Sequence, residues 1–291
     1  MGNLGIYGQR KYYDLSGESV PFGNAWYVDS TNGATTGDGK TWDTAMSTIA
    51  LAVAAASAND SIYIAPGDYI ISEAIAIATA GLRLVGPNES CNDYRALIYS
   101  SAACDLITVD ANQVSITGLG LSTVGGDGNC ITISGTANSY KCYIARCRFD
   151  GYSKTGNGIE CDSTQDSPDL MVEDCLFRSF SAAAIDSDAT RAVYRNNLIW
   201  VTAASVGIDF KQTGGNRPDN MAIGNYIIGS NSTDTGIKIA ATEPTDGTLM
   251  IANNVITNCA LNITQDKSDA GLANNGTYGN GATLFQVDPN A

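Results

Sequence analysis

The chain repeats a short motif in which a Cys or Asn is followed by one variable residue and then by a large apolar residue. The Cys or Asn recurs at intervals of 28, 22, 28 and 29 residues, at Cys147, Cys175, Asn197, Asn225 and Asn254. The apolar pair Leu119 and Leu121 stands 28 residues before Cys147 and Phe149 and begins the same pattern. Because a repeat of this length is typical of solenoid folds, the sequence predicts a stack of similar coils.

A second motif with a similar period indicates which kind of solenoid this is. It recurs at intervals of 28, 26, 23, 29 and 24 residues, at Ile131, Ile159, Ile185, Ile208, Ile237 and Leu261. Each is followed by a polar residue and, in most copies, by another apolar one; the polar residues are Thr132, Glu160, Asp186, Asp209, Lys238 and Asn262. Alternation of period two predicts strands, and the Gly- and Asn-rich segments between them predict turns of variable length. We therefore predict an all-β parallel β-helix with at least two short strands in each coil, stacked about 4.8 Å apart.

The periodicity also divides the chain. Residues 1–24 have none, and we expect an extended arm that anchors the protein on a partner surface through Tyr7, Tyr12, Tyr13 and Phe22. Residues 25–265 are predicted to form the β-helix, with a short helix near 48–58 that covers the open apolar end of the first coil. Residues 266–291 are polar and rich in Gly and Asn, and are predicted to be a tail or cap.

Composition excludes several classes of function. The chain has 16 basic and 30 acidic residues, a net charge of −14, and no run of Lys or Arg, so we expect no nucleic-acid binding. It has no histidine, which removes the commonest general base and transition-metal ligand. We expect no cofactor-binding site and no metal site.

The eight cysteines have no CxxC or zinc spacing. Three of them, Cys147, Cys161 and Cys175, fall on inward positions, where a thiol behaves as a small apolar group. We expect buried free thiols, which agrees with synthesis in a reducing host cytoplasm. No segment is apolar over the length of a signal peptide or a membrane span, so we expect neither classical secretion nor membrane insertion.

The segment from 26 to 69 carries a resemblance. It places Tyr27-Val28-Asp29 before a loop of Gly and Asp, Trp42 and Ala45 ahead of the expected helix, and the sequence DSIYIAPGDY at its end. These features resemble the N-terminal segment of right-handed parallel β-helix proteins with a pectin-lyase-like fold. The same segment occurs in polysaccharide lyases, in bacteriophage tailspikes and in other virion appendages. The resemblance covers about a sixth of the chain and specifies the fold more than the function.

Two patterns in the sequence are similar to those of catalytic or binding sites. The loop GATTGDGKT imitates a phosphate-binding loop, but Ala34 stands where the first glycine is required, so nucleotide binding is not expected. Enzymes of the family that residues 26–69 resemble cleave polysaccharides by β-elimination or with paired carboxylates. Candidate groups are Asp162, Asp166, Asp169, Glu173, Asp174, Asp186, Asp188 and Asp209, with Lys154, Arg178, Arg191, Lys211 and Arg217. None lies in a recognisable catalytic motif, and no catalytic residue is assigned; outward charges that keep a solenoid soluble are the favoured interpretation.

The Cys and Asn column is interpreted as an inward ladder at a turn. Each Asn amide is expected to bond to the backbone and to the amide of the next coil, which satisfies polar groups that water does not reach.

If that ladder points inward, the residues between its members point outward. The outward positions become apolar from Leu176 onward, and the predicted contacts are Leu176, Leu198, Trp200, Tyr226, Ile228 and Val255. A sheet that is apolar on both faces must be covered. We expect further copies of the chain to cover it around a threefold axis, as a homotrimer. A loop of the same chain, or a sugar stacked on Trp200 and Tyr226, is the alternative.

These features together favour a non-catalytic structural protein of a bacteriophage virion, a capsid decoration or a surface or tail appendage. Its partners would be other virion proteins and a possible host-surface glycan. The alternatives are a polysaccharide lyase or depolymerising tailspike, and a carbohydrate-binding adhesin.

Overall fold

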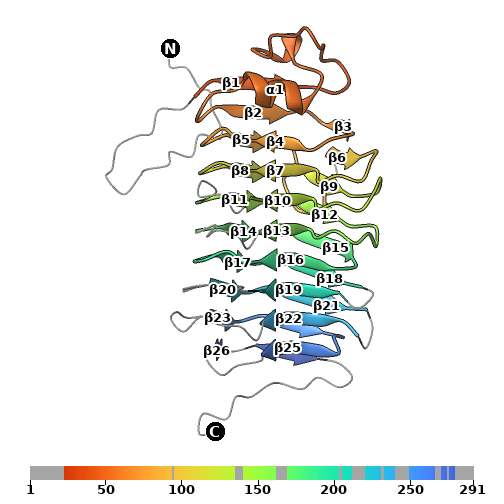
Figure 1. The fold of residues 1–291 in the computed structure, drawn as a ribbon, viewed down its shortest axis with the longest axis vertical. Coiled ribbons are helices and arrows are strands. Elements are labelled where there is room, and N and C mark those ends of the chain that lie inside the picture. Colours follow the sequence, from red (N-terminus) through yellow and green to blue (C-terminus); the bar gives the residue numbers. More distant parts are fainter. Residues whose placement is uncertain are drawn as a thin grey trace, which may run out of the picture.

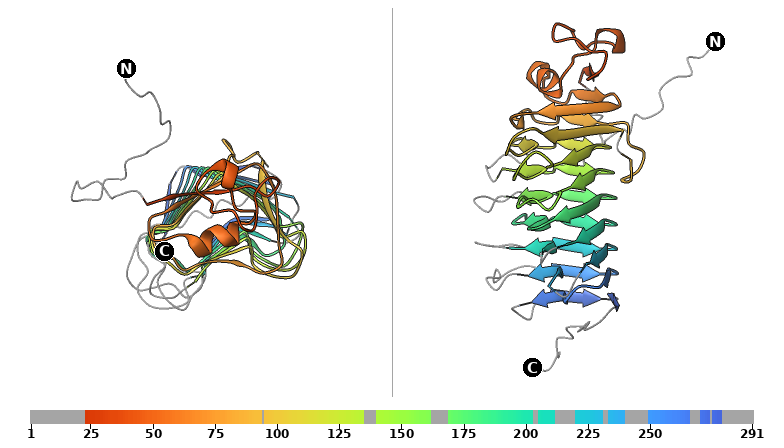
Figure 2. Two further views of the ribbon diagram at one scale, coloured as in Figure 1. Left: turned by 90° about the horizontal axis from the view of Figure 1, so that it is seen from above. Right: turned by 90° about the vertical axis from the view of Figure 1, so that its right-hand side faces the viewer.

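The computed structural model describes residues 23–93, 95–134, 140–161, 169–202, 205–211, 220–230, 233–239, 249–265, 270–273 and 275–278. These residues wind as a stack of coils in which successive strands of the chain join three parallel sheets in turn (Figures 1 and 2). The predicted all-β parallel β-helix is therefore confirmed, with three sheets around the core.

The chain passes from sheet 1 to sheet 2 to sheet 3 in each full coil. Sheet 1 has ten strands, β1 (Ala25–Val28), β2 (Ser61–Ile64), β5 (Arg83–Val85), β8 (Ser115–Thr117), β11 (Tyr143–Ala145), β14 (Met171–Glu173), β17 (Val193–Arg195), β20 (Asn220–Ile223), β23 (Leu249–Ala252) and β26 (Ala270–Ala273). Sheet 2 has nine, β3 (Gly67–Ile71), β6 (Ala96–Ser100), β9 (Gly120–Ser122), β12 (Arg148–Asp150), β15 (Leu176–Phe180), β18 (Leu198–Val201), β21 (Tyr226–Gly229), β24 (Val255–Thr257) and β27 (Gly276–Tyr278). Sheet 3 has eight, β4 (Ile75–Ile77), β7 (Ile107–Val109), β10 (Ile131–Ile133), β13 (Ile159–Cys161), β16 (Ala183–Ser187), β19 (Val206–Phe210), β22 (Thr235–Ile239) and β25 (Leu261–Gln265).

Inward side chains stack on their equivalents in the neighbouring coils. Ile131 pairs with Ile159, which pairs with Ile185, and all three are fully buried. On sheet 2 the rings of Phe149 and Phe177 stack with centroids 4.4 Å apart and planes 2° from parallel. The core is thus a set of apolar columns along the solenoid axis, as the alternation predicts.

The helix expected near residues 48–58 is present but shorter. α1 (Ile49–Ala55) begins after Thr48, whose hydroxyl accepts a hydrogen bond from the Leu51 amide at 3.3 Å, and a short 3-10 helix, η1 (Trp42–Thr44), precedes it. α1 ends because Ala56 is already extended and the chain turns at Asn59, which has a φ of 67°, into β2. The helix contacts β1, β2 and β4 at the N-terminal end of the solenoid (Figure 2). Its role as a cap stays a prediction.

Two sequence predictions at the C-terminal end are wrong. Ile263, not Leu261, pairs with Ile237, and Thr264, not Asn262, pairs with Lys238. The alternating sequence fits both registers, because a shift of two residues keeps every side chain on its face. The strands also continue beyond residue 265, since β26 and β27 pair with β23 and β24.

The inward ladder lies at the bend between sheets 1 and 2, and the prediction for it is confirmed. The Asn197 Nδ2 donates to Asn225 Oδ1 at 3.0 Å, and the Asn225 Nδ2 donates to Asn254 Oδ1 at 2.9 Å. Asn225 Nδ2 also donates to the backbone carbonyl of Tyr194 at 2.9 Å. Asn275 extends the ladder, because it accepts from Asn254 Nδ2 at 3.0 Å. Buried polar groups of the bend are therefore satisfied from one coil to the next.

Cysteines hold the same ladder positions in earlier coils. Cys147 and Cys175 are fully buried free thiols, and the Cys175 amide donates to Asn197 Oδ1 at 3.0 Å. Cys161 is 3% exposed and also free. The expectation of buried, unpaired thiols at these three positions is confirmed.

Replacing a ladder asparagine should lower the stability of the solenoid. In Asn225→Ala the Tyr194 carbonyl and the Asn197 amide lose their partner, and we expect the free energy of unfolding in urea to fall by about 2–4 kcal/mol. Thr257→Ala, on the outer face of sheet 2, is the control and should change it by less than about 1 kcal/mol. Equal losses in the two variants would contradict a special role for the ladder.

Candidate functional site

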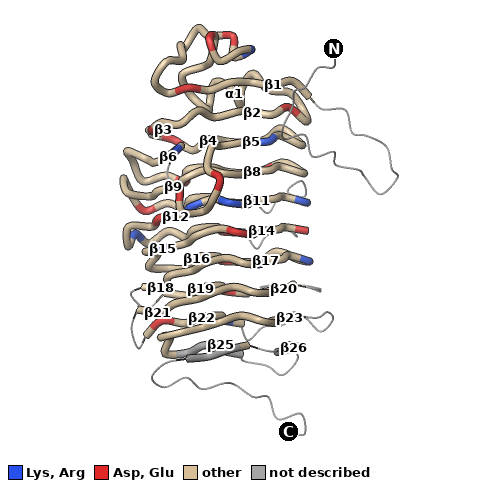
Figure 3. Tube along the Cα trace, turned by 180° about the vertical axis from the view of Figure 1, so that it is seen from behind, with Lys and Arg blue, Asp and Glu red and all other residues tan. Residues whose placement is uncertain are grey.

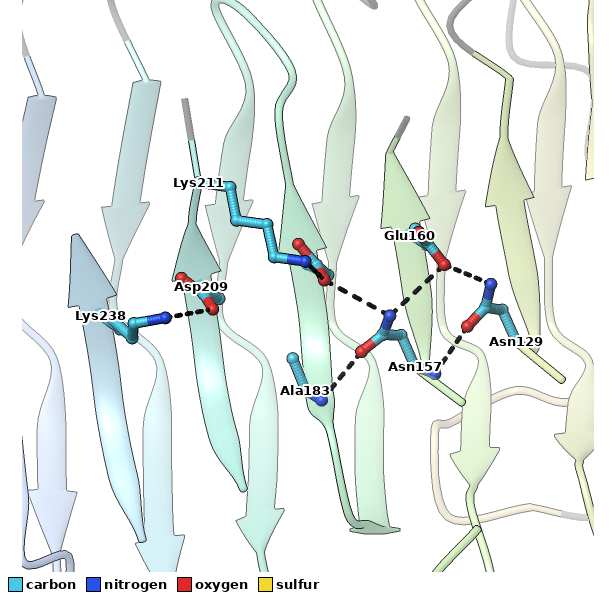
Figure 4. A network of polar contacts seen from close by, with 8 residues as sticks. Asn129, Asn157, Glu160, Ala183, Asp209, Lys211 and Lys238 are labelled. Atoms are coloured by element: carbon cyan, nitrogen blue, oxygen red, sulfur yellow. Dashed lines mark hydrogen bonds and ion pairs between the residues drawn. The ribbon is translucent and has the colours of Figure 1, made fainter. Parts of the chain in front are cut away.

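The outer face of sheet 3 carries a polar column that runs along the solenoid. Thr132, Glu160, Asp186, Asp209 and Lys238 pair in register from β10 to β22. Three carboxylates therefore stand one above another in successive coils, about 4.8 Å apart at the backbone. Figure 4 shows Glu160, Asp209 and Lys238 of this column from close by.

Lysine side chains neutralise two of the three carboxylates, Asp186 and Asp209. The Lys211 ammonium, just beyond β19, forms an ion pair with Asp186 Oδ2, and Lys238 Nζ lies 3.0 Å from Asp209 Oδ2 (Figure 4). Asp186 and Asp209 are each only 5% exposed. Burial of two like charges in adjacent coils requires such partners, since an unpaired buried charge is costly.

Asparagine amides connect the column to the coils before it. Asn157 Nδ2 lies 3.4 Å from both Glu160 Oε2 and Asp186 Oδ2, and it donates to them. Asn129 Nδ2 also donates to Glu160 Oε2. Backbone contacts fix these amides, because Asn157 N donates to Asn129 Oδ1 at 2.7 Å and Ala183 N donates to Asn157 Oδ1 at 2.9 Å (Figure 4).

Burial changes the acidity of Asp186. It raises the pKa of Asp186 to about 6; the Lys211 ion pair opposes the rise, and the nearby charges of Asp209 and Glu160 add to it. For Lys211, burial works against the charged form, but the Asp186 partner outweighs it and the pKa is raised. Asp186 is thus a carboxyl that changes charge near neutral pH.

The polar column offers few groups for catalysis or metal binding. Asp209 Oδ1 is buried and has no hydrogen-bond partner among the described residues, while its other oxygen is held by Lys238. In the described part of the chain, no group of three or more Asp, Glu and Cys side chains is arranged to hold a metal ion. The arrangement provides one acid of raised pKa beside a second, ion-paired carboxylate.

The remaining sequence candidates do not join this column. Asp169 pairs with Arg191 at 2.8 Å on the surface, and Glu173 pairs with Arg195 on the outer face of sheet 1. Asp188 is buried just beyond β16. Asp174 and Lys154 lie at other bends, and Asp162, Asp166 and Arg217 lie outside the described residues.

The outer face of sheet 2 has the apolar columns that the sequence predicts. Leu198, Tyr226 and Val255 pair in register, and so do Trp200 and Ile228. Trp200 is 40% exposed and Tyr226 is 43% exposed, while the other three are half-buried beside them. We call these five side chains the apolar face of sheet 2.

Leu176 pairs with Leu198 but is not available on this face, because it is only 2% exposed. Its neighbour in register on the other side, Arg148, donates from Nη1 to the carbonyl of Asn92 at 3.2 Å. Asn92 lies in the segment between β5 and β6. At this end of the column a segment of the same chain therefore reaches sheet 2.

Trp200 has a cationic neighbour within the same column. The Arg178 guanidinium carbon lies 5.3 Å from the centre of a Trp200 ring, and Arg178 Nε lies 3.5 Å from Asp150 Oδ2. Arg178 thus stacks on the apolar face from one side while Asp150 holds its charge. The predicted anchor residues Tyr7, Tyr12, Tyr13 and Phe22 lie outside the described residues.

Sequence reasoning missed a second apolar column, on the outer face of sheet 1. It consists of Met171, Val193, Met221 and Met250, which pair in register. Their spacings of 22, 28 and 29 residues equal those of Cys175, Asn197, Asn225 and Asn254, four residues later. That shared spacing could have revealed the column. It was missed because the strands before each ladder residue are too short to show an alternating pattern.

No protein-family model matches this chain, and no curated protein is similar to it in sequence. Solved structures are similar in fold. Pectin methylesterase PemA from Erwinia chrysanthemi is 14% identical with a TM-score of 0.54, and the match covers 92% of each chain. A rice weevil pectin methyl esterase is 14% identical with a TM-score of 0.53 and 91% of each chain covered. A rhamnogalacturonan lyase is 12% identical with a TM-score of 0.56, covering 81% of this chain and 69% of the lyase.

Likeness at this level of identity establishes the fold alone. The chain has the right-handed parallel β-helix of pectin-lyase-like proteins, as the segment from 26 to 69 indicates. Among the described residues, no helix has the length and apolar character needed to cross a membrane.

The raised pKa of Asp186 should appear in the pH dependence of stability. Because the folded-state pKa of about 6 lies above the ordinary 3.8, the stabilisation is present below about pH 4 and is lost as the pH rises through 6. Between pH 4 and 7 the free energy of unfolding of the wild type should therefore fall by about 1–3 kcal/mol relative to Asp186→Asn. Urea titrations at a series of pH values measure this difference, and parallel curves for the two proteins would show that the pKa is not raised.

Proposed function

We propose that this chain is a non-catalytic structural component of a bacteriophage virion, a capsid decoration or a surface or tail appendage, in which β-helices pack side by side as a homotrimer. The observation that carries the proposal is the apolar face of sheet 2. Trp200 and Tyr226 stand exposed among half-buried Leu198, Ile228 and Val255, on the outside of a sheet whose inner face is already apolar. Such a surface is typical of a protein contact.

The polar column of sheet 3 supports a structural role rather than a catalytic one. Asp186 and Asp209 are 5% exposed and each is paired with a lysine, so a substrate would have to displace an ion pair to reach them. Their amide and lysine contacts instead connect one coil to the next, which suits a rigid rod.

The location on a virion is supported by the resemblance of residues 26–69 to tailspike and appendage proteins and by the aromatic residues of the arm. In this proposal the protein is made in the host cytoplasm, residues 1–22 dock on another virion protein, and the solenoid projects outward. Gly23 and Asn24 stay with the solenoid, because they bond to Asn59 and Asp60.

Gene neighbourhood tests the virion assignment. Genes for capsid, portal or tail proteins beside this one are expected, whereas a cluster for polysaccharide uptake and degradation would contradict the assignment. Deletion of residues 1–22 should abolish attachment to the particle and leave the thermal unfolding midpoint unchanged. Particles that still carry the shortened chain would contradict the anchoring role.

Native mass spectrometry at micromolar concentration tests the assembly. We expect three chains of 30.3 kDa in one particle. The double variant Trp200→Asp/Ile228→Asp should dissociate because it places charges in the contact, with a dissociation constant raised about 10- to 100-fold. Ile70→Asp is the control, on the outer face of sheet 2 in the second coil; a wild-type monomer would remove the proposal.

A second candidate function is cleavage of an acidic polysaccharide, which one observation favours. Asp186 and Asp209 are in register on adjacent parallel strands, so their backbones lie about 4.8 Å apart, and paired carboxylates are the groups that retaining glycosidases use. Asp186, with a pKa of about 6, also has the character of a general acid.

An activity screen separates the two functions. Purified protein is incubated with pectin and other acidic polysaccharides while reducing ends, unsaturated products and methanol are measured. We expect no product. Product that disappears in both Asp186→Asn and Asp209→Asn would establish the enzymatic function instead.

A further inference from the structure

Sheets 1 and 2 meet at a sharp corner in the C-terminal half of the solenoid. Only two residues separate β17 from β18, β20 from β21 and β23 from β24. The first residue of each bend is left-handed, with φ of 55° at Asn196, 67° at Gly224 and 56° at Asn253. Because the bends are so short, the outer faces of the two sheets adjoin directly, on the outside of the closed cross-section in Figure 2.

Both sides of this corner are apolar. The outward positions of the six strands hold a single charged residue. We call the positions that are not buried the corner face: Val193, Arg195, Met221, Ile223 and Met250 on sheet 1, with Leu198, Trp200, Tyr226, Ile228, Val255 and Thr257 on sheet 2; Ala252 is only 3% exposed. Met250 is 41% exposed, similar to Trp200 and Tyr226. In Figure 3, β18, β20 and β23 are drawn without acidic or basic residues.

The charge of the chain points to the occupant of this surface. The protein carries a net charge of −14, so two copies repel each other over most of their surfaces. The corner face has no acidic residue, and its one charge, Arg195, is positive and paired with Glu173. Carboxylates lie instead on sheet 3, where Glu160, Asp186 and Asp209 form the polar column. The corner face is where further copies of this chain are least opposed.

We propose that the corner face assembles heterologously: the sheet 1 side of one copy packs against the sheet 2 side of the next, and three corners meet at the threefold axis. This inference rests on the proposed homotrimer and defines its contact. In the simpler alternative the apolar face of sheet 2 alone makes the contact, and the sheet 1 side stays uncovered.

A closed ring agrees with the shape and size of the corner face. One flat neighbour covers only one side of a convex corner, whereas in a ring each side meets a different neighbour. The corner face has five positions on the sheet 1 side and six on the sheet 2 side, fewer than the roughly 20–30 residues on each side of a standard interface. A single contact is therefore weak, and a closed ring in which every copy makes two contacts provides the stability.

Surface variants on the two sides test the proposal. Met221→Asp/Met250→Asp changes the sheet 1 side, and Trp200→Asp/Ile228→Asp changes the sheet 2 side. Both pairs are expected to convert the trimer to monomers, with dissociation constants raised about 10- to 100-fold by native mass spectrometry and sedimentation. Ser115→Asp, in the same outward column as Met221 but in an earlier coil, is the matched control and should stay trimeric. Circular dichroism confirms that each variant is folded.

The outcomes separate this inference from the proposed function. If the sheet 2 variant dissociates while the sheet 1 variant stays trimeric, the heterologous corner is wrong and the homotrimer stands. A monomeric wild type overturns both.

A crosslink identifies the surfaces in contact. Tyr226 is replaced by the photoreactive residue p-benzoylphenylalanine, the trimer is irradiated, and peptides are mapped by mass spectrometry. Crosslinks between chains to the peptides that contain Met221 or Met250 are expected. Crosslinks to the sheet 2 strands alone would show a contact of like surfaces and overturn the inference.

Discussion

Parallel pairing in register between successive coils is the constraint on which the rest of this structure depends. It places each side chain directly over its equivalent in the next coil. Each column must therefore hold side chains that interact favourably with similar side chains above and below them. Isoleucines do so through packing, and Phe149 and Phe177 do so by stacking their rings. The asparagines of the bend do so because an amide both donates and accepts. Asn197, Asn225 and Asn254 therefore satisfy one another where water does not reach.

The same constraint makes stacked charges costly and explains the outer face of sheet 3. Three carboxylates in register would repel one another, and burial removes the water that would screen them. The chain offsets this with lysines on Asp186 and Asp209, with amides on Glu160, and with a raised pKa at Asp186. The column that most resembles a catalytic site is thus largely occupied by its own coil-to-coil contacts. Along the corner face the columns hold no acidic residue and one basic residue, Arg195, so side-by-side packing of identical chains meets the least repulsion there.

Much of the fold follows from the sequence, because alternation and spacing are local properties. The Cys and Asn spacing located the bend between sheets 1 and 2, and the Ile spacing located sheet 3. The outward column of sheet 1 was not predicted, because the strands of this sheet are short and largely apolar on both faces. No alternation is visible in β14, β20 and β23, whose sequences are Met-Val-Glu, Asn-Met-Ala-Ile and Leu-Met-Ile-Ala. The register of β25 was predicted wrongly, because Leu261 and Ile263 are two residues apart and a shift of two residues preserves the alternation.

By itself the sequence determined which residues of the sheet 2 and sheet 3 strands point into the coil and which point out, since period two and the repeat spacing together fix their orientation. Only the tertiary structure decided what each outward residue meets. Leu176 is buried, in register with Arg148, whose guanidinium bonds to Asn92 far upstream, whereas Trp200 and Tyr226 in the next coils are exposed. Asp186 forms an ion pair with Lys211 from beyond the next strand of sheet 3. The outer apolar columns of sheets 1 and 2 form one surface, because bends of only two residues join the strands of the two sheets. These outcomes depend on how the bends place separate segments in space, which the local pattern of a strand does not encode.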